Sequence, residues 1–165
     1  MTGPYSHVLL IAGARSWADE RTMRTAFNTT WRSWGGPTGV SRPLLVSGHC
    51  PKGADAMAER LWRGAGFDVL EMAADWDTHG HGAGFVRNSQ MVEVVVSLRE
   101  QGSRTMCAAF LDTCRKAGCP QARNQQLAPC IPGHFSHGTV HCRSEALSAG
   151  IETIDVFPSL LTSAG

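Results

Sequence analysis

The sequence predicts a three-layer α/β fold, in which a mostly parallel sheet of five or more strands lies between helices on both faces. Short apolar runs alternate along the chain with longer segments of helical periodicity, an alternation typical of right-handed β–α–β crossovers. Four glycine-containing turns come after apolar runs, as expected where parallel strands lead into helices. With 165 residues, the whole chain (1–165) is expected to form a single domain.

Five short segments are predicted to be the strands. The first two are continuous apolar runs, which indicates strands that are buried on both faces of the sheet. The remaining three are also short and follow predicted helices, as parallel strands do. In chain order, the predicted strands are Val8–Ala12, Leu44–Ser47, Phe67–Met72, Thr105–Leu111 and Ile151–Phe157.

Four segments between these strands are predicted to be helices. Asp19 is a suitable N-cap for the first helix, and Gly35-Gly36-Pro37 ends it. The clearest periodicity begins at Ala54, with apolar residues at i, i+3, i+4, i+7, i+8 and i+11 before Gly66 closes the helix. The predicted helices are Asp19–Trp34, Ala54–Ala65, Gly84–Leu98 and Thr139–Ala149, and Ala73–Gly82 is predicted to be a loop.

The charge and composition exclude several classes of partner. A formal net charge of +1 argues against a protein that coats nucleic acid or a membrane surface, because both roles need a strong basic excess. No apolar run approaches the ~20 residues of a membrane span. The first residues lack the pattern of an export signal, so we expect a cytoplasmic protein.

Two of the glycine turns are predicted to bind a phosphate. The first contains Gly13, Arg15 and Ser16, and the second runs from Gly48 to Asp55. Glycine allows the backbone to approach a ligand closely, and amides at a helix start attract anions. The alternative is a pair of tight turns with solvated cations. In the second turn the residues assigned to the ligand are Gly48, Lys52, Gly53, Ala54 and Asp55.

Two further segments are predicted to complete this binding site. Ser136, His137, Gly138 and Thr139 open the last helix, where Thr139 can cap the helix or donate to an anion. The segment Ala74–Met91 supplies a ring on which a base can stack and a carboxylate for a ribose hydroxyl. The residues assigned to the ligand here are Asp75, Trp76, Arg87 and Asn88. Asp77 could replace Asp75 as the acceptor, and Trp76 could instead be a core residue that does not contact the ligand.

These motifs resemble the YspA-like branch of the SLOG superfamily, a Rossmann-like group. The resemblance covers most of the chain apart from Asp112–Phe135, and it implies that the protein binds a nucleotide derivative. Superfamily enzymes often dimerise through helices beside the site, so a homodimer is an expectation. The matching motifs are Gly13-Ala14-Arg15-Ser16-Trp17, Gly48–Asp55, Ala74–Met91, Gly138-Thr139 and Ala149-Gly150-Ile151.

The resemblance leaves the catalytic residues undetermined. Phosphoribohydrolases of the superfamily cleave an N-glycosidic bond with an arginine and a glutamate. Arg87 matches that arginine, but Cys142 occupies the position of the glutamate, and a thiol cannot take over the acid–base role of a carboxylate. Glu145 and Asp75 are the remaining candidates for that role.

The segment Asp112–Phe135 is a Cys/His-rich insertion that does not fit the α/β pattern. Cys114, Cys119, Cys130 and His134 form two closely spaced pairs, an arrangement typical of structural zinc sites. Because metal binding supplies folding free energy, zinc would explain how a polar insertion stays ordered. The alternatives are a surface insertion with free thiols, or a fourth ligand drawn from His137, His141 and Cys142.

Three functions follow from the sequence, in this order of preference. The first is a sensor, carrier or sequestering protein for a nucleotide derivative such as ADP-ribose. The second is a hydrolase of nucleoside 5′-monophosphates or related N-glycosides. The third is an accessory module for nucleic-acid processing, against which the near-neutral charge argues.

Overall fold

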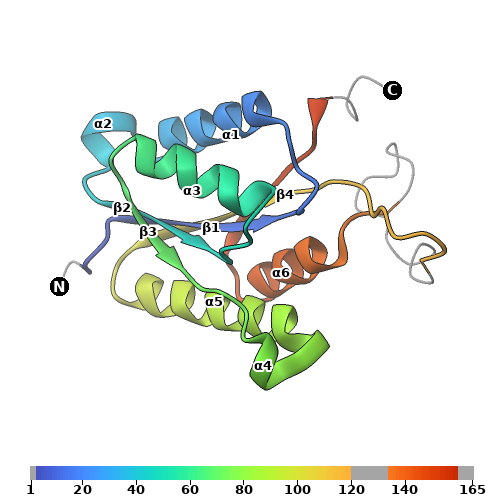
Figure 1. Cartoon of the computed structure of the whole chain (residues 1–165). Helices are drawn as coiled ribbons and strands as arrows, with labels where there is room; N and C mark the ends of the chain where they lie inside the picture. The colour runs from blue at the N-terminus through green and yellow to red at the C-terminus, as the bar shows by residue number, and fades with distance from the viewer. Residues whose placement is uncertain (1–2, 120–133, 160–165) are drawn as a thin grey trace.

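A computed structural model describes residues 3–119 and 134–159, and it has five strands in one sheet (Figure 1). All strand pairs are parallel, and the strand order is β3-β2-β1-β4-β5. The predicted α/β fold with a parallel sheet is therefore confirmed. The strands are β1 (His7–Gly13), β2 (Pro43–Ser47), β3 (Asp68–Glu71), β4 (Arg104–Phe110) and β5 (Glu152–Val156).

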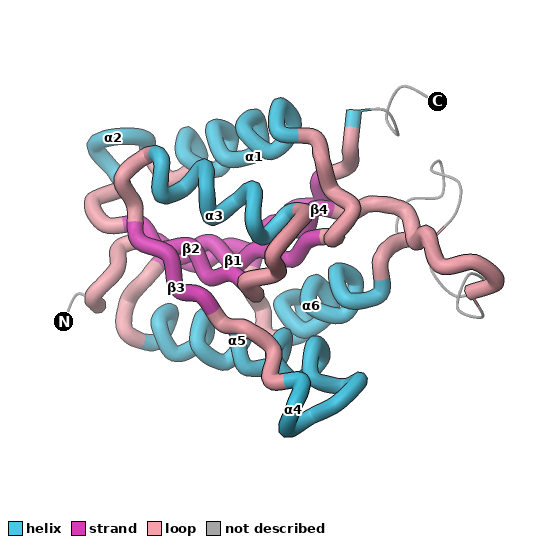
Figure 2. The backbone as a smooth tube through the Cα atoms, viewed as in Figure 1, coloured by secondary structure: helices cyan, strands magenta, loops and turns pink. Residues whose placement is uncertain are grey.

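Helices cover both faces of the sheet, as the sequence predicts (Figures 1 and 2). Helices α1 and α3 lie on one face, and α5 and α6 lie on the other. Within residues 3–119 and 134–159, no helix is both long and apolar enough to cross a membrane. The helices are α1 (Glu20–Ser33), α2 (Gly36–Gly39), α3 (Ala54–Gly64), α4 (Trp76–His79), α5 (Ala83–Glu100) and α6 (His137–Ser148).

The segment Ala73–Gly82 is not the simple loop that the sequence predicts. Asp75 accepts a hydrogen bond from the Thr78 amide at 3.0 Å and caps the short helix α4. A 3-10 turn (η1, Gly80–Gly82) then leads directly into α5. The prediction is wrong here because a single turn of helix is too short for apolar periodicity to appear, and a local cap is enough to form it.

The core consists of two apolar layers, one on each face of the sheet. Side chains of β1 alternate between them, with Leu9 and Ile11 packed toward α1 and α3 and Leu10 packed toward α5 and α6. All three side chains are fully buried. This double coverage explains why the central strands have continuous apolar sequences instead of alternating ones.

The strand order places a crevice at the carboxyl ends of the central strands. From β1 the chain proceeds outward through β2 and β3, and then crosses to β4 and β5 on the other side. The direction of winding therefore reverses between β1 and β4. In open parallel sheets, ligands bind at the carboxyl ends of the strands beside such a reversal.

Glycine at position 13 allows α3 to pack directly against the end of β1. A Cβ added at Gly13 would overlap the Cβ of Ala54, the first residue of α3. The Ala54 amide also donates a hydrogen bond to the Ala14 carbonyl oxygen at 3.0 Å. Two glycine turns that are far apart in the sequence are thus joined at the edge of the crevice.

We expect the substitution Gly13→Ala to destabilise the fold. The new methyl group meets the short Ala54 side chain, which has no rotamer by which to move away. Overpacking of this kind costs about 1–3 kcal/mol. Thermal unfolding followed by circular dichroism should show a melting temperature that is lower by several degrees.

Gly64→Ala is the matched control. An added Cβ at Gly64, the last residue of α3, has no atom within 4 Å. The same change should therefore leave stability unchanged or raise it by less than about 1 kcal/mol. Equal melting temperatures for the two variants would contradict the close approach of α3 to β1.

Candidate functional site

A pocket of about 430 Å³ opens at the carboxyl ends of β1 and β4. Its walls come from the turn after β1, from α4 and the start of α5, from residues 113–116 after β4, and from the start of α6. Eleven of the sixteen residues predicted to bind the ligand line this pocket. They are Gly13, Arg15, Ser16, Asp55, Trp76, Arg87, Asn88, Ser136, His137, Gly138 and Thr139.

The other five predicted residues do not line the pocket. Gly53 and Ala54 pack under the turn after β1, where a Cβ at Gly53 would lie 2.5 Å from the Ala14 oxygen. Lys52 is exposed, and Asp75 caps α4. Gly48 contacts the guanidinium group of Arg87 and does not line the pocket itself. The second glycine turn therefore supports the pocket from outside and contributes only Asp55 from the predicted set.

Arg87 is buried, and backbone oxygens hold part of its guanidinium group. Nη1 donates to the Gly48 and Met72 carbonyl oxygens, and Nε donates to Asn88 Oδ1 at 3.2 Å. A Cβ at position 48 would overlap the guanidinium group, so a side chain there would have to displace Arg87. These bonds use Nε and Nη1 of a side chain that also lines the pocket.

Asp55 contributes a buried carboxyl group to the same wall. Its Oδ2 accepts a hydrogen bond from the Cys50 amide at 3.2 Å. Burial raises the pKa of Asp55 above its usual range, and the Cys50 amide and the nearby Arg87 oppose this shift. Among the described residues that line the pocket, Asp55 is the only one with a carboxyl group.

The start of α6 carries a buried hydroxyl group without a partner. Asn88 Nδ2 donates to the Gly138 carbonyl oxygen at 3.1 Å, and the Ser136 amide donates to the Asp112 oxygen at 3.0 Å. Both bonds fix this end of the helix. Thr139 is only 2% exposed, and among the described residues its Oγ1 has no hydrogen-bond partner. An unpaired buried hydroxyl costs free energy. Because Thr139 lines the pocket, an acceptor atom of a ligand could pair with this hydroxyl and remove that cost.

Aromatic side chains line the pocket on the side of α4 and α5. Trp76 is 50% exposed and Phe85 is 47% exposed. The guanidinium carbon of Arg15 lies 5.8 Å from the centre of the Trp76 ring, and the Phe85 ring lies 4.5 Å from the His141 ring. Large exposed rings beside a pocket are available to stack on a flat ligand group.

Two of the three catalytic candidates lie away from the pocket lining. Glu145 is in a separate groove between α5 and α6, where Ser89 Oγ donates a hydrogen bond to its carboxylate at 3.4 Å. The carboxylate of Asp75 caps the N-terminus of α4. Arg87 alone lines the pocket. Cys142 also lines it, and burial raises the pKa of its thiol to about 12.

The residues that sequence reasoning missed are mainly in the segment after β4. Arg115 and Lys116 are cationic and line the pocket, and Arg115 pairs with Asp112 at 3.1 Å. Asp112 is buried and joins this segment to the turn after β1, because Ser16 Oγ donates to its Oδ2 at 2.6 Å. No local pattern identifies these three residues, since the fold alone brings them to the crevice. Cys50, His81 and Phe85 also line the pocket.

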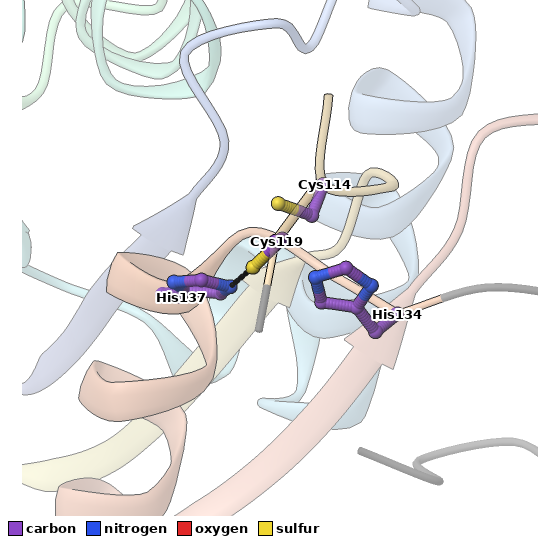
Figure 3. Close-up of side chains that lie close together, drawn as sticks. All are labelled: Cys114, Cys119, His134 and His137. Carbon is purple, nitrogen blue, oxygen red and sulfur yellow. Dashed lines mark hydrogen bonds between the residues drawn. The ribbon is translucent and has the colours of Figure 1, made fainter. Parts of the chain in front are cut away.

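The described part of the insertion and the first residue of α6 together supply four side chains that could hold a metal ion (Figure 3). We call them the Cys/His tetrad: Cys114, Cys119, His134 and His137. Their ligand atoms all lie within 4.8 Å of one another. Three of the four predicted metal ligands belong to it, Cys130 lies outside the described residues, and His137 was predicted as an alternate.

Backbone pairing holds the two halves of the tetrad together. Thr113 and Phe135 form an antiparallel bridge, and the Cys114 amide donates to the His134 oxygen at 2.7 Å. Cys119 Sγ lies 3.2 Å from His137 Nε2. His134 is buried, and its Nε2 has no hydrogen-bond partner within residues 3–119 and 134–159. A metal ion would satisfy this buried nitrogen.

The fold and the pocket define a Rossmann-like α/β protein with a ligand crevice at the reversal point of its sheet. The family model for the "YspA, cpYpsA-related SLOG family" matches residues 7–79. The chain is also similar to the "Gene 61 protein" of Mycobacterium phage D29, with 33% identity over 153 residues, which cover 89% of this chain and 94% of that protein. The chain belongs to this SLOG family, and membership indicates a nucleotide-related role.

The raised pKa of Asp55 predicts how stability depends on pH. The folded protein retains a proton that the unfolded chain releases near pH 3.8, so part of the stability is lost as the pH rises above that value. Asp55→Asn cannot ionise and avoids this loss. We therefore expect the stability of Asp55→Asn, relative to the parent protein, to increase between pH 3.5 and pH 7 in urea unfolding.

Asp19→Asn should show the opposite trend. Hydrogen bonds from Ser159 and Thr22 lower the pKa of Asp19 well below its usual range. Its ionised carboxylate therefore stabilises the fold above about pH 3.8, and this stability is lost as the pH falls. As the pH rises from 3 to 7, the stability of Asp19→Asn relative to the parent protein should therefore decrease. Parallel trends for the two variants would contradict the buried state of Asp55.

Proposed function

We propose that this protein binds a nucleotide derivative, such as ADP-ribose, and acts as its sensor, carrier or sequestering protein. The charge of the pocket lining carries this proposal. Among the described lining residues, four side chains are cationic and one carries a carboxyl group, and one of the cations, Arg115, also pairs with the buried Asp112 at 3.1 Å. Such an excess favours a phosphate-bearing ligand. The cations are Arg15, Arg87, Arg115 and Lys116.

The uncharged groups of the pocket support the same ligand class. Trp76 and Phe85 offer exposed rings for a base. Thr139 Oγ1 and the amides at the start of α6 offer donors for a phosphate, since a helix N-terminus attracts negative charge. A molecule that combines a flat ring system with phosphate groups uses both sets of contacts.

Thr139→Val tests the phosphate end of this proposal. Replacing a buried hydroxyl that lacks a partner by a methyl group should leave the free protein as stable or raise its stability by about 1 kcal/mol. The variant should nevertheless bind ADP-ribose at least roughly 10-fold more weakly, because a hydrogen bond to a charged group is lost. Isothermal titration calorimetry and thermal unfolding measure the two effects.

Thr30→Val is the control for the same change elsewhere. Thr30 is buried in α1, where its hydroxyl contacts Met106 Sδ at 3.8 Å, away from the pocket. This variant should keep the parent affinity. The proposal fails if neither ADP-ribose nor nucleoside mono- and diphosphates at millimolar concentration stabilise the parent protein. Equal affinities of Thr139→Val and the parent would contradict the role of Thr139.

A second candidate function is hydrolysis of an N-glycosidic bond in the bound nucleotide. The observation that favours it is the buried carboxyl group of Asp55 beside Arg87. Water would attack C1′ of the ribose and transfer a proton to the Asp55 carboxylate while the C1′–N bond breaks. The base would leave with the electrons of the C1′–N bond and would take up that proton from Asp55.

Release of the free base from nucleoside 5′-monophosphates, followed by chromatography, tests this second function. Asp55→Asn should abolish the release and still bind the nucleotide in calorimetry. Glu145→Gln, which changes the carboxyl group in the separate groove, should release the base at the parent rate. A flat time course of the parent protein with all four ribonucleotides would remove the hypothesis.

We further propose that the metal of the Cys/His tetrad is zinc in a closed, structural site. Thiolate sulfur and imidazole nitrogen are the ligands that zinc prefers, and four protein ligands complete its tetrahedral coordination. The proposal fits a cytoplasmic protein, in which thiols stay reduced. Association into a homodimer stays a prediction from the resemblance, and sedimentation measurements can check it.

A further inference from the structure

The Cys/His tetrad and the pocket share residues. Cys114 and His137 belong to the tetrad and also line the pocket, whereas Cys119 and His134 belong to the tetrad alone. Figure 3 shows Cys114 and Cys119, from the segment after β4, gathered with His134, which precedes α6, and His137, the first residue of α6. An ion held by the tetrad would therefore join two walls of the pocket that are distant in the sequence.

Both walls carry groups that the proposed ligand needs. Arg115 and Lys116 directly follow Cys114, and Thr139 comes two residues after His137 on the first turn of α6. Between the walls, the described backbone contacts are the bridge of Thr113 with Phe135 and the two hydrogen bonds beside it, from the Cys114 amide to the His134 carbonyl oxygen and from the Ser136 amide to the Asp112 carbonyl oxygen. The remaining described contact is between tetrad side chains, Cys119 Sγ and His137 Nε2 at 3.2 Å.

The spacing of the four ligand atoms is close to what zinc requires. Zinc–sulfur bonds of about 2.3 Å and zinc–nitrogen bonds of about 2.0 Å at tetrahedral angles place ligand atoms about 3.3–3.8 Å apart. The tetrad atoms lie within 4.8 Å of one another, so small side-chain movements suffice. Two thiolates neutralise the charge of the ion, and the adjacent cations Arg115 and Lys116 therefore do not oppose its binding.

We propose that zinc at the Cys/His tetrad regulates the pocket: the ion fixes the two walls, and the pocket binds its phosphate-bearing ligand more tightly when zinc is present. This inference rests on the proposed function. Without the ion, the ligand must itself order the segment after β4 and the start of α6, which costs conformational entropy. Coupling is reciprocal, so the bound ligand also raises the affinity for zinc.

Cys119→Ser and His134→Asn separate this coupling from direct contact, because neither residue lines the pocket. The parent protein, stripped with a chelator in the presence of a non-thiol reductant, should bind one zinc ion per chain, and its cobalt form should show the absorption of tetrahedral thiolate coordination. Both variants should lose stoichiometric zinc binding. They should also bind ADP-ribose roughly 5- to 150-fold more weakly than the zinc-loaded parent.

His79→Ala is the control, since His79 is exposed on α4 and belongs to neither the tetrad nor the pocket lining. It should keep the zinc stoichiometry and the affinity of the parent. Hydrogen exchange gives a readout that needs no ligand. Zinc should slow the exchange of the amides in residues 137–140 and 113–116 in the parent and leave exchange in α1 unchanged.

The outcomes separate the two proposals. Absence of zinc binding to the parent overturns the inference, and so does zinc binding that changes neither hydrogen exchange at the pocket nor affinity for ADP-ribose. In another outcome, zinc slows hydrogen exchange in residues 113–116 and 137–140 while neither the zinc-loaded nor the zinc-free protein binds ADP-ribose. That outcome supports the ordering of the pocket by zinc and counts against the proposed ligand. Protection together with tighter binding supports both.

Discussion

The contact between the start of α3 and the end of β1 is the constraint on which the crevice depends. Gly13 leaves room for Ala54, and the Ala54 amide bonds to the Ala14 carbonyl oxygen. This contact sets where the turn from Gly48 to Gly53 runs. That turn in turn holds the Arg87 guanidinium through the Gly48 oxygen and the Asp55 carboxylate through the Cys50 amide.

The sequence predicts the framework of this arrangement well because the framework follows from local rules. The apolar runs of β1 and β2 and the periodicity of α3 can be identified without tertiary contacts. The positions of the glycines can also be identified from the sequence, but the structural reason for a glycine at each position cannot. The turn at Gly48–Asp55 has the composition of a phosphate loop, yet its glycines serve contact between protein segments, with Arg87 at Gly48 and with Ala14 and Arg15 at Gly53.

Residues that the fold brings together from a distance are the ones sequence reasoning misses. Asp112 shows this best: a single acidic residue at a strand end has no pattern, yet it accepts a hydrogen bond from Ser16, 96 positions earlier. His137 is named from the sequence only as an alternate metal ligand, because its place in the tetrad depends on the bridge between Thr113 and Phe135. Cys130 is predicted from the spacing of short pairs, and because it lies outside the described residues it stays a prediction.

The chemistry of the pocket follows from the unusual thiol of Cys142. At this buried position a carboxylate would lie near Arg87 and Asp55, and two carboxylates in one low-dielectric site repel each other. The neutral thiol, with its pKa near 12, removes that repulsion. Asp55 is then the sole acidic group among the described lining residues, and its charge is opposed by several cations. This balance of charges favours an anion in the pocket whether or not the pocket also cleaves one, so binding is the simpler of the two proposed functions.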